Sequence, residues 1–403
     1  MESVKELSKA IAPVKELSAK EAQIDPFPFF RQCRESTPVR YDPQRECWDI
    51  FGYEDVYNVL KDHSTFSSVR PIKGPVLLGS IIGMDPPKHM QMRGIVSKAF
   101  TPKSIEELGP RIASIAEELL NAVAHDGTMD LVHDLAVPLP VIVIAELLGI
   151  PAQDRRLFKE WSDSIVKGPA SGNKEDMHRL YLEREKTRRE LDEYFLNVIA
   201  ERRNRPEDDL VTKLVEAEVN GERLNDMEIV EFCILLLAAG NETTTNLITN
   251  AVRRMAEAPA LQTRLQDNPA LIESFIEEVL RYYPPVLSLS RYATKDVRIG
   301  HADIRKGELI IPWIGSANRD ESKFDQPDQF IEDRTPNPHM SFGFGNHFCL
   351  GAPLARLEAK IALRIIMNRV TNIRFADHFE FKPIRSTFVY GVEELPILFD
   401  AKL

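Results

Sequence analysis

The chain has 403 residues, of which 43% are apolar and 28% are charged. Its 51 basic and 62 acidic side chains give a net charge of −11, which disfavours non-specific attraction to nucleic acid or to an anionic membrane. Neither is therefore an expected partner. A chain of this length and composition can bury a sizeable core, either as one large domain or as two or three smaller ones.

The first residues of the chain, MESVKELSKAIAPVKELSAKEA, lack the apolar core of a signal peptide. No uninterrupted apolar run reaches the length that a membrane span needs. The four cysteines are too few and too irregularly spaced for a disulfide framework, so reduced thiols are expected at Cys33, Cys47, Cys233 and Cys349. These observations predict a cytoplasmic protein without a membrane span.

Strand and helix patterns can be followed along the chain. Residues 39–51 predict a hairpin around Asp-Pro-Gln-Arg, residues 297–314 alternate around the turn residues Gly300 and Gly307, and another strand pattern lies near Phe388. Apolar residues three and four apart predict helices over 104–124, 141–149, 178–202 and 354–370. The Gly-Pro-Ala-Ser-Gly-Asn stretch at 168–173 predicts a mobile surface connection. We expect a mainly α-helical fold with small β-sheets, forming one domain over residues 1–403.

Residues 239–244 read Ala-Gly-Asn-Glu-Thr-Thr and continue a helix that begins as the apolar run 229–239. Burying Asn, Glu and Thr side chains is costly unless they are paired or used. One interpretation is therefore a functional site inside a buried helix. The other is that the helix emerges into solvent at this point.

A second unusual stretch, residues 342–351, reads Phe-Gly-Phe-Gly-Asn-His-Phe-Cys-Leu-Gly and leads into a predicted helix. Pro353 suits the first turn of that helix, so the amides of residues such as Leu350 and Gly351 would face the Cys349 sulfur and stabilise its thiolate. The glycines would let the backbone approach a flat ligand such as a porphyrin.

Three other interpretations of this stretch are possible. It could be a glycine-rich turn around a buried cysteine. A dinucleotide phosphate loop is excluded, because the third glycine and the βαβ pattern are missing. A zinc site formed by His339, His347 and Cys349 would lack a clustered fourth ligand and would not explain the glycines.

The pattern Phe-Gly-x-Gly-x-His-x-Cys-x-Gly resembles the haem-binding signature of the cytochrome P450 family of haem-thiolate monooxygenases, with every fixed position filled. The resemblance implies the cytochrome P450 fold and haem b held by Cys349. It implies activation of O2 and hydroxylation of a lipophilic small molecule such as a fatty acid, terpenoid or steroid. Electrons would come from a separate ferredoxin or flavodoxin with its reductase. The alternatives are a haem-based gas sensor or carrier, and an oxidase driven only by peroxide.

The same resemblance assigns roles to further residues. Glu242 and Thr243 match the acid–alcohol pair that delivers protons, although many bacterial members have Asp at the first position. Glu278, Arg281 and Arg334 match a buried structural triad; by itself, the Glu278 and Arg281 spacing indicates only a surface ion pair. The expected contacts with the haem propionates are His89, Arg93, Arg291 and His347. Other expected haem contacts are Ala239, Phe342, Gly343 and Gly351.

The expected substrate pocket is entirely apolar, and any of its members could equally belong to the core. Its residues would be Leu77, Leu78, Ile81, Ile82, Leu235, Val286, Leu287, Leu289, Phe388 and Val389. On the helix after the cysteine, Arg356, Lys360 and Arg364 are four residues apart and share one face. That basic stripe predicts docking of an acidic redox partner, and the alternative is a solvated helix face.

Overall fold

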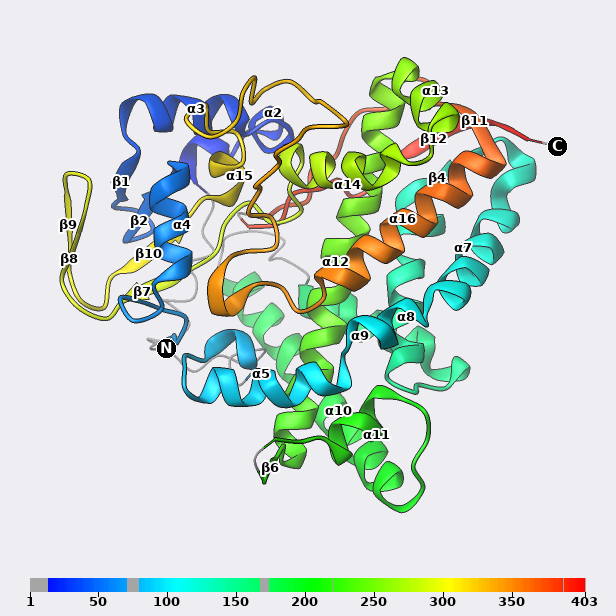
Figure 1. Cartoon of the computed structure of the whole chain (residues 1–403), viewed down its shortest axis with the longest axis horizontal. Helices are drawn as coiled ribbons and strands as arrows, with labels where there is room; N and C mark the ends of the chain where they lie inside the picture. Colours follow the sequence, from blue (N-terminus) through cyan, green and yellow to red (C-terminus); the bar gives the residue numbers. More distant parts are fainter. Residues whose placement is uncertain (1–13, 71–79, 167–173, 220, 387, 403) are drawn as a thin grey trace.

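The structure is a computed structural model that describes residues 14–70, 80–166, 174–219, 221–386 and 388–402. Leu77 and Leu78 of the expected pocket lie outside the described residues, as does the stretch 168–173. Helices dominate, and a five-stranded sheet lies to one side beside α3 and α4 (Figure 1). The prediction of a mainly helical fold with small sheets is confirmed.

The α-helices follow the predicted periodicity with one difference. The segment 104–124 is two helices rather than one, because Pro110 occupies the first turn of a new helix. In chain order the helices are α2 (Lys20–Ile24), α3 (Phe27–Ser36), α4 (Tyr53–Lys61), α5 (Lys88–Ala99), α6 (Pro102–Glu106), α7 (Gly109–Val123), α8 (Pro138–Leu147), α9 (Arg155–Val166), α10 (Lys174–Asn204), α11 (Leu210–Glu216), α12 (Asp226–Glu257), α13 (Pro259–Asp267), α14 (Leu271–Tyr282), α15 (Ile314–Ala317) and α16 (Ala352–Arg369).

Two of the three predicted strand regions form as expected. The hairpin over 39–51 is β1 (Val39–Asp42) and β2 (Cys47–Ile50), and residues 297–314 contain β8 (Val297–Ile299), β9 (Ala302–Ile304) and β10 (Leu309–Pro312). Near Phe388 the described residues form two isolated bridges, Val286 with Val389 and Pro383 with Val392, but no strand, and the last strand comes later as β12 (Pro396–Ala401). The other strands are β3 (Phe66–Ser67), β4 (Thr128–Asp130), β5 (Glu218–Val219), β6 (Glu222–Arg223), β7 (Arg291–Ala293) and β11 (Val370–Phe375).

The sheets join distant parts of the chain. The largest has the strand order β1-β2-β10-β7-β3, in which β10 runs parallel to β2 and antiparallel to β7. A second sheet has the order β11-β12-β4, and the pairs β5-β6 and β8-β9 are separate hairpins. The pairing of β10 with β7 places Ile310 opposite Arg291, so the position of Arg291 is fixed by the sheet.

The long helix α12 passes through the middle of the molecule and packs against α8, α9, α10, α14 and α16 (Figure 1). It begins with a capping box, in which the Asn225 side chain accepts a hydrogen bond from the Glu228 N–H and the Glu228 carboxylate accepts one from the Asn225 N–H. It ends before Pro259, which starts α13. Burial of its apolar residues on several sides makes α12 the centre of the largest hydrophobic cluster.

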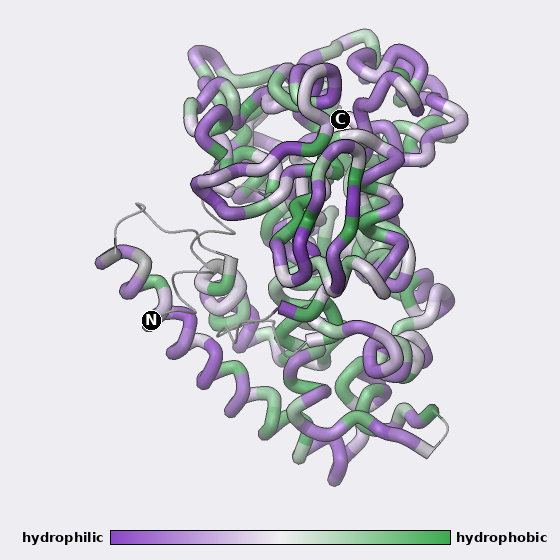
Figure 2. Tube along the Cα trace, turned by 90° about the vertical axis from the view of Figure 1, so that its left-hand side faces the viewer, coloured by the Kyte–Doolittle hydropathy of each residue, from purple (hydrophilic) through white to green (hydrophobic). Residues whose placement is uncertain are grey.

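Polar and apolar residues alternate in short runs along the chain (Figure 2). Within the described residues, no helix is both long enough and apolar enough to cross a membrane.

Candidate active site

One turn of α12 is less buried than the turns on either side of it. Most of the helix from Ile229 to Met255 is buried, yet Ala239 is exposed and Glu242 and Thr243 are only partly buried. These three residues are three and four positions apart, so they share one face of the helix. Because the following turns are buried again, the helix does not emerge into solvent here, and the polar residues instead border a local space.

Glu242 and Thr243 have the chemistry of a proton relay. Burial raises the pKa of the Glu242 carboxyl to about 7. The Thr243 hydroxyl donates to the Ala239 carbonyl at 2.8 Å, which leaves its oxygen able to accept a hydrogen bond. A carboxyl group that titrates near neutral pH, next to a hydroxyl on the same helical face, can both give and take a proton.

The loop at 342–351 is shaped by its glycines. Gly343 and Gly345 have φ values of 72° and 70°, in the left-handed region that glycine adopts without strain. A Cβ at Gly345 would also approach the Leu60 carbonyl to 3.1 Å, so the loop lies tightly against the end of α4. The Cys349 N–H closes the loop by donating to the Phe342 carbonyl at 2.8 Å. As a result, Cys349 stands just before the first turn of α16.

Cys349 is exposed, whereas the other three cysteines are buried. Desolvation by the surrounding protein raises the pKa of the Cys349 thiol, whereas the N–H groups of Gly351 and Ala352 and the nearby charges of Arg93 and Arg356 act in the opposite direction. The amides of Gly351, which was expected, and of Ala352 therefore act on the sulfur. A metal ion bound to the sulfur would provide the further stabilisation that a thiolate needs.

Three basic side chains, those of His89, His347 and Arg291, lie close together beside this loop. None of them forms an ion pair with an acidic side chain among the described residues. The His89 and His347 rings lie 4.2 Å apart, and His89 has no hydrogen-bond partner for either ring nitrogen within that part of the chain. Burial, with Arg291 and His89 nearby, lowers the pKa of His347 to about 3, and burial lowers the pKa of Arg291 to about 10. Buried groups of this kind call for an anionic ligand.

These observations fit the propionate end of a haem. Two carboxylates would give acceptors to both ring nitrogens of His89 and to Nε2 of His347, which have none among the described residues, and would add to the negative charge that Asp85 supplies near all three groups. The Arg93 guanidinium donates to the carbonyls of Asn346 at 3.1 Å and Phe348 at 2.6 Å, and its expected contact with a propionate stays a prediction. Arg93 thus holds the cysteine loop. Two other expected haem contacts lie close to these groups. A Cβ added at Gly351 would lie 3.9 Å from the Cys349 sulfur, and the partly buried Phe342 ring lies under the Arg356 guanidinium.

The structure brings Glu278, Arg281 and Arg334 together in the interior. Both oxygens of the fully buried Glu278 accept from Arg281, each at 2.8 Å, and Arg334 Nε lies 3.1 Å from Oε2. The Ile331 N–H and the Asn337 side chain also donate to this carboxylate. The network ties α14 to the segment that precedes the cysteine loop, so it supports the position of that loop from behind.

The zinc interpretation is wrong. Among the residues that the structure describes, no group of three or more His, Cys, Asp or Glu side chains could hold a metal ion. His339 lies instead against Glu277, with 3.1 Å between Nε2 and Oε2.

The expected basic stripe on α16 needs a correction. Arg356 forms a two-pronged ion pair with Glu277 at 2.7 and 2.8 Å, and Lys360 pairs with Glu273. Although burial raises the pKa of Glu277, Arg356 and His339 lower it to about 2, so its charge is retained. Both acids belong to α14, which sequence reasoning did not place beside α16. The stripe is therefore largely neutralised, and Arg364 is its exposed end.

The described members of the expected substrate pocket fall into two groups. The exposed group consists of Ile82 and Phe388, at 47% and 50% exposure. The other group is partly buried at Val286 and Leu289 and buried at Ile81, Leu235, Leu287 and Val389. Only Ile82 and Phe388 leave a large apolar surface that a lipophilic ligand could cover.

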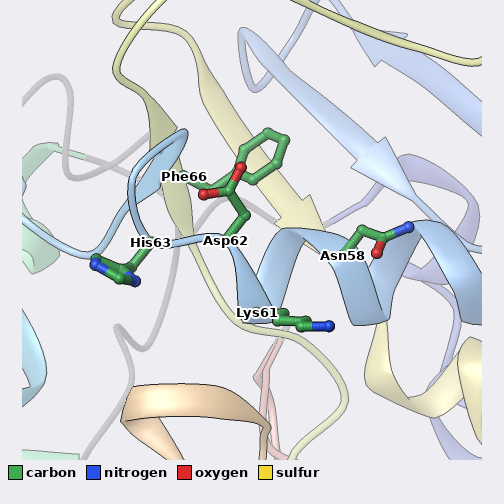
Figure 3. A pocket seen from close by; sticks show the side chains of 5 residues that line it. All are labelled: Asn58, Lys61, Asp62, His63 and Phe66. Atoms are coloured by element: carbon green, nitrogen blue, oxygen red, sulfur yellow. The ribbon is translucent and has the colours of Figure 1, made fainter.

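A separate hollow of about 490 Å³ lies at the end of α4 (Figure 3). It is lined by Asn58, Lys61, Asp62, His63 and Phe66. None of these is an expected site residue, although His63 Nδ1 lies 3.1 Å from the Asn346 amide of the cysteine loop.

Comparison with known proteins identifies the family. The sequence profile of the family described as Cytochrome P450 matches residues 27–374. The chain belongs to the cytochrome P450 family. Cytochrome P450 109 of Bacillus spizizenii is 46% identical over 396 residues, which cover 98% of this chain and 97% of the relative.

Two crystal structures of CYP109E1 from Bacillus megaterium agree with this assignment. The complex with testosterone has a TM-score of 0.89 and 47% identity, covering 94% of this chain and 99% of that one. The complex with corticosterone has a TM-score of 0.88 and 45% identity, covering 94% and 100%. The fold is thus the cytochrome P450 fold, the cofactor is haem b, and the protein is a P450 monooxygenase of the oxidoreductase class. The comparisons give no support to the gas-sensor alternative.

Proposed function

We propose that this P450 hydroxylates a lipophilic small molecule in the space beside Ala239, Glu242 and Thr243, with haem b held by Cys349. The observation that carries the proposal is the incompletely buried turn of α12 at Ala239, Glu242 and Thr243. At this turn, two groups suited to proton transfer border a space beside a helix that is otherwise mostly buried. A sensor that only binds a gas needs no such pair, and an oxidase driven by peroxide alone does not need it either.

Haem b, when bound, supplies the activation of O2 and the transfer of one oxygen atom. The protein's part is to hold and orient that group. Cys349 is the proposed iron ligand, and His89, His347 and Arg291 are the proposed partners of the propionates. Glu242 and Thr243 hold and pass protons at their carboxyl and hydroxyl oxygens, and apolar walls exclude water.

A steroid is the substrate class that we favour over a fatty acid or a terpenoid. One relative of known structure, CYP109E1 from Bacillus megaterium, has been crystallised in complex with testosterone and in complex with corticosterone. The exposed apolar surface of Ile82 and Phe388 is compatible with a large rigid ligand.

A ferredoxin or flavodoxin with its reductase is the proposed electron source, acting in the cytoplasm, where the four unpaired thiols would stay reduced. We propose docking near the exposed end of α16 at Arg364. Because Arg356 and Lys360 are paired with Glu277 and Glu273, the charge contribution to docking should be smaller than that of three unpaired cations.

The Thr243→Ala change should uncouple the enzyme. Loss of the hydroxyl removes one half of the proposed relay, so we expect product formed per electron consumed to fall by roughly tenfold or more and hydrogen peroxide to rise, with haem content unchanged. The measurement is parallel quantification of product, peroxide and consumed reductant.

The matched control for this experiment is Thr244→Val. Thr244 is the next residue on the helix but is buried at 4% exposure, away from the incompletely buried face. Its variant should couple like the wild type. An unchanged yield per electron in Thr243→Ala would remove the relay role from Thr243.

A further inference from the structure

One turn beyond the proposed relay, the same face of α12 is fully buried. Ala239, Glu242, Thr243 and Asn246 are spaced at three and four residues, so all four lie on one face. Unlike the first three, Asn246 is only 1% exposed. Its amide nitrogen has no hydrogen-bond partner among the described residues, so hydrogen bonding by this nitrogen does not account for its burial. Some other part of the chain is pressed against this side chain.

That part is Gly391, in the C-terminal segment. A Cβ at Gly391 would lie 2.0 Å from Asn246 Oδ1 and 2.6 Å from Asn246 Cγ, distances that no real side chain could keep. Gly391 does not have a positive φ, so its backbone conformation would accept any residue. The Asn246 side chain is therefore the main reason for glycine here, and Ile384 Cδ1, which would lie 3.1 Å from the Cβ, adds a weaker restriction. The contact sets how closely the C-terminal segment can approach α12.

Gly391 is firmly connected to the turn that carries Phe388 and Val389. The Ile384 N–H donates to the Gly391 carbonyl at 3.1 Å, which closes the turn on itself. On its other side, the Leu287 N–H donates to the Phe388 carbonyl at 2.7 Å, next to the bridge between Val389 and Val286. A shift at Gly391 would therefore be passed to Phe388 and Val389 rather than absorbed within the turn.

The neighbouring residue, Tyr390, holds the same turn in place through three hydrogen bonds. Its hydroxyl donates to the Ile24 carbonyl at 2.8 Å and accepts from Arg253 of α12 at 3.3 Å. Its N–H donates to the Pro285 carbonyl at 3.0 Å. Because Tyr390 already meets α12 at Arg253, the contact between Gly391 and Asn246 is a second point that sets the spacing between this turn and α12.

We propose that Asn246 and Gly391 are a pair of positioning residues that set substrate orientation. Their contact fixes the distance between Phe388, on the proposed pocket wall, and the relay at Glu242 and Thr243 on the same helix. It thereby determines which carbon of a bound substrate is presented for oxidation. Neither residue needs to touch the substrate. The inference rests on the proposed function, because it concerns the orientation of that substrate.

The test compares Gly391→Ala, Asn246→Ala and the double variant, each as the haem-loaded full chain with testosterone as the probe. In Gly391→Ala the new Cβ pushes the turn away from α12, so we expect the ratio of hydroxylated products to change by about threefold or more. Asn246→Ala removes the obstacle, and the double variant should return toward the wild-type ratio. In that variant the nearest of the named contacts that remains is Ile384 Cδ1, the end of a flexible side chain, at 3.1 Å from the new Cβ.

Gly109→Ala is the control for the substitution itself, because a Cβ there would meet only Ile361 Cδ1 at 3.9 Å. Thermal unfolding of the haem-loaded proteins gives an independent readout: Gly391→Ala should lower the midpoint and the double variant should recover it. If Gly391→Ala does not fold, Asn246→Ala alone still tests the proposal, because it should shift the product ratio.

The outcomes separate the inference from the proposed function. If the wild type yields hydroxylated testosterone but neither single variant changes the product ratio, the positioning role is wrong and the function stands. A change in Gly391→Ala that the double variant does not reverse also overturns the pair. If the wild type and the Gly109→Ala control bind haem but give no oxygenated product, the proposed function fails and the inference falls with it.

Discussion

Cys349→His should abolish the strongly red-shifted Soret band that the reduced, carbon monoxide-bound wild type is expected to show. That band depends on electron donation from a thiolate, and an imidazole in its place gives the spectrum of a histidine-ligated haem. The surroundings of Cys349 should still accept the haem, because His89, His347 and Arg291 at the proposed propionate end are unchanged. The expected result is thus complete loss of the band with part of the haem retained.

Cys33→Ala is the control for this spectral experiment. Cys33 is a core residue on α3 at 4% exposure, and its variant should keep the red-shifted band. A wild-type spectrum that already resembles that of a histidine-ligated protein would contradict the assignment of Cys349.

Glu278→Ala should cost about 3–5 kcal/mol of folding free energy, because it leaves the buried guanidinium of Arg281 without its partner. Arg281 is 0% exposed and gives two hydrogen bonds to Glu278, so neither water nor another acid can replace the carboxylate without a rearrangement. Arg334 would lose its contact as well. We expect little folded, haem-containing protein from Glu278→Ala, and an intermediate loss from Glu278→Gln, as measured by denaturant unfolding.

Glu273→Gln gives the comparison on the same helix. The Glu273 side chain is 67% exposed and pairs with Lys360 at the surface, so its variant should change stability by less than about 1 kcal/mol. Equal stability of the Glu278 and Glu273 variants would show that the buried network does not support the fold.

Local patterns in the sequence predicted much of the fold. The spacing of apolar residues located the long helices, and alternation around Gly300 and Gly307 located β8, β9 and β10. The break between α6 and α7 was missed although Pro110 marks it. The strand expected near Phe388 does not form among the described residues, because that turn is held by bonds to residues 285–287 rather than by a continuous ladder. That residues 1–403 form one domain stays a prediction.

The candidate site was predictable where its residues are close in sequence. The glycines and the cysteine of residues 342–351 act locally, and so do Glu242 and Thr243. Contacts between distant segments could not be read from spacing. Glu277 neutralises Arg356 from another helix, and Gly391 meets Asn246 only after the chain has folded back on α12. An Asn four residues after Glu242 in a buried helix was the signal that could have drawn attention to Asn246.

The most direct test of the account is to supply the purified, haem-loaded protein with reductant, a ferredoxin and its reductase, testosterone and isotopically labelled O2. A monooxygenase should place one labelled oxygen atom in each hydroxylated product molecule, because the inserted atom comes from O2. A hydroxylated product that carries oxygen from water, or formed equally well when O2 is removed, would contradict the account.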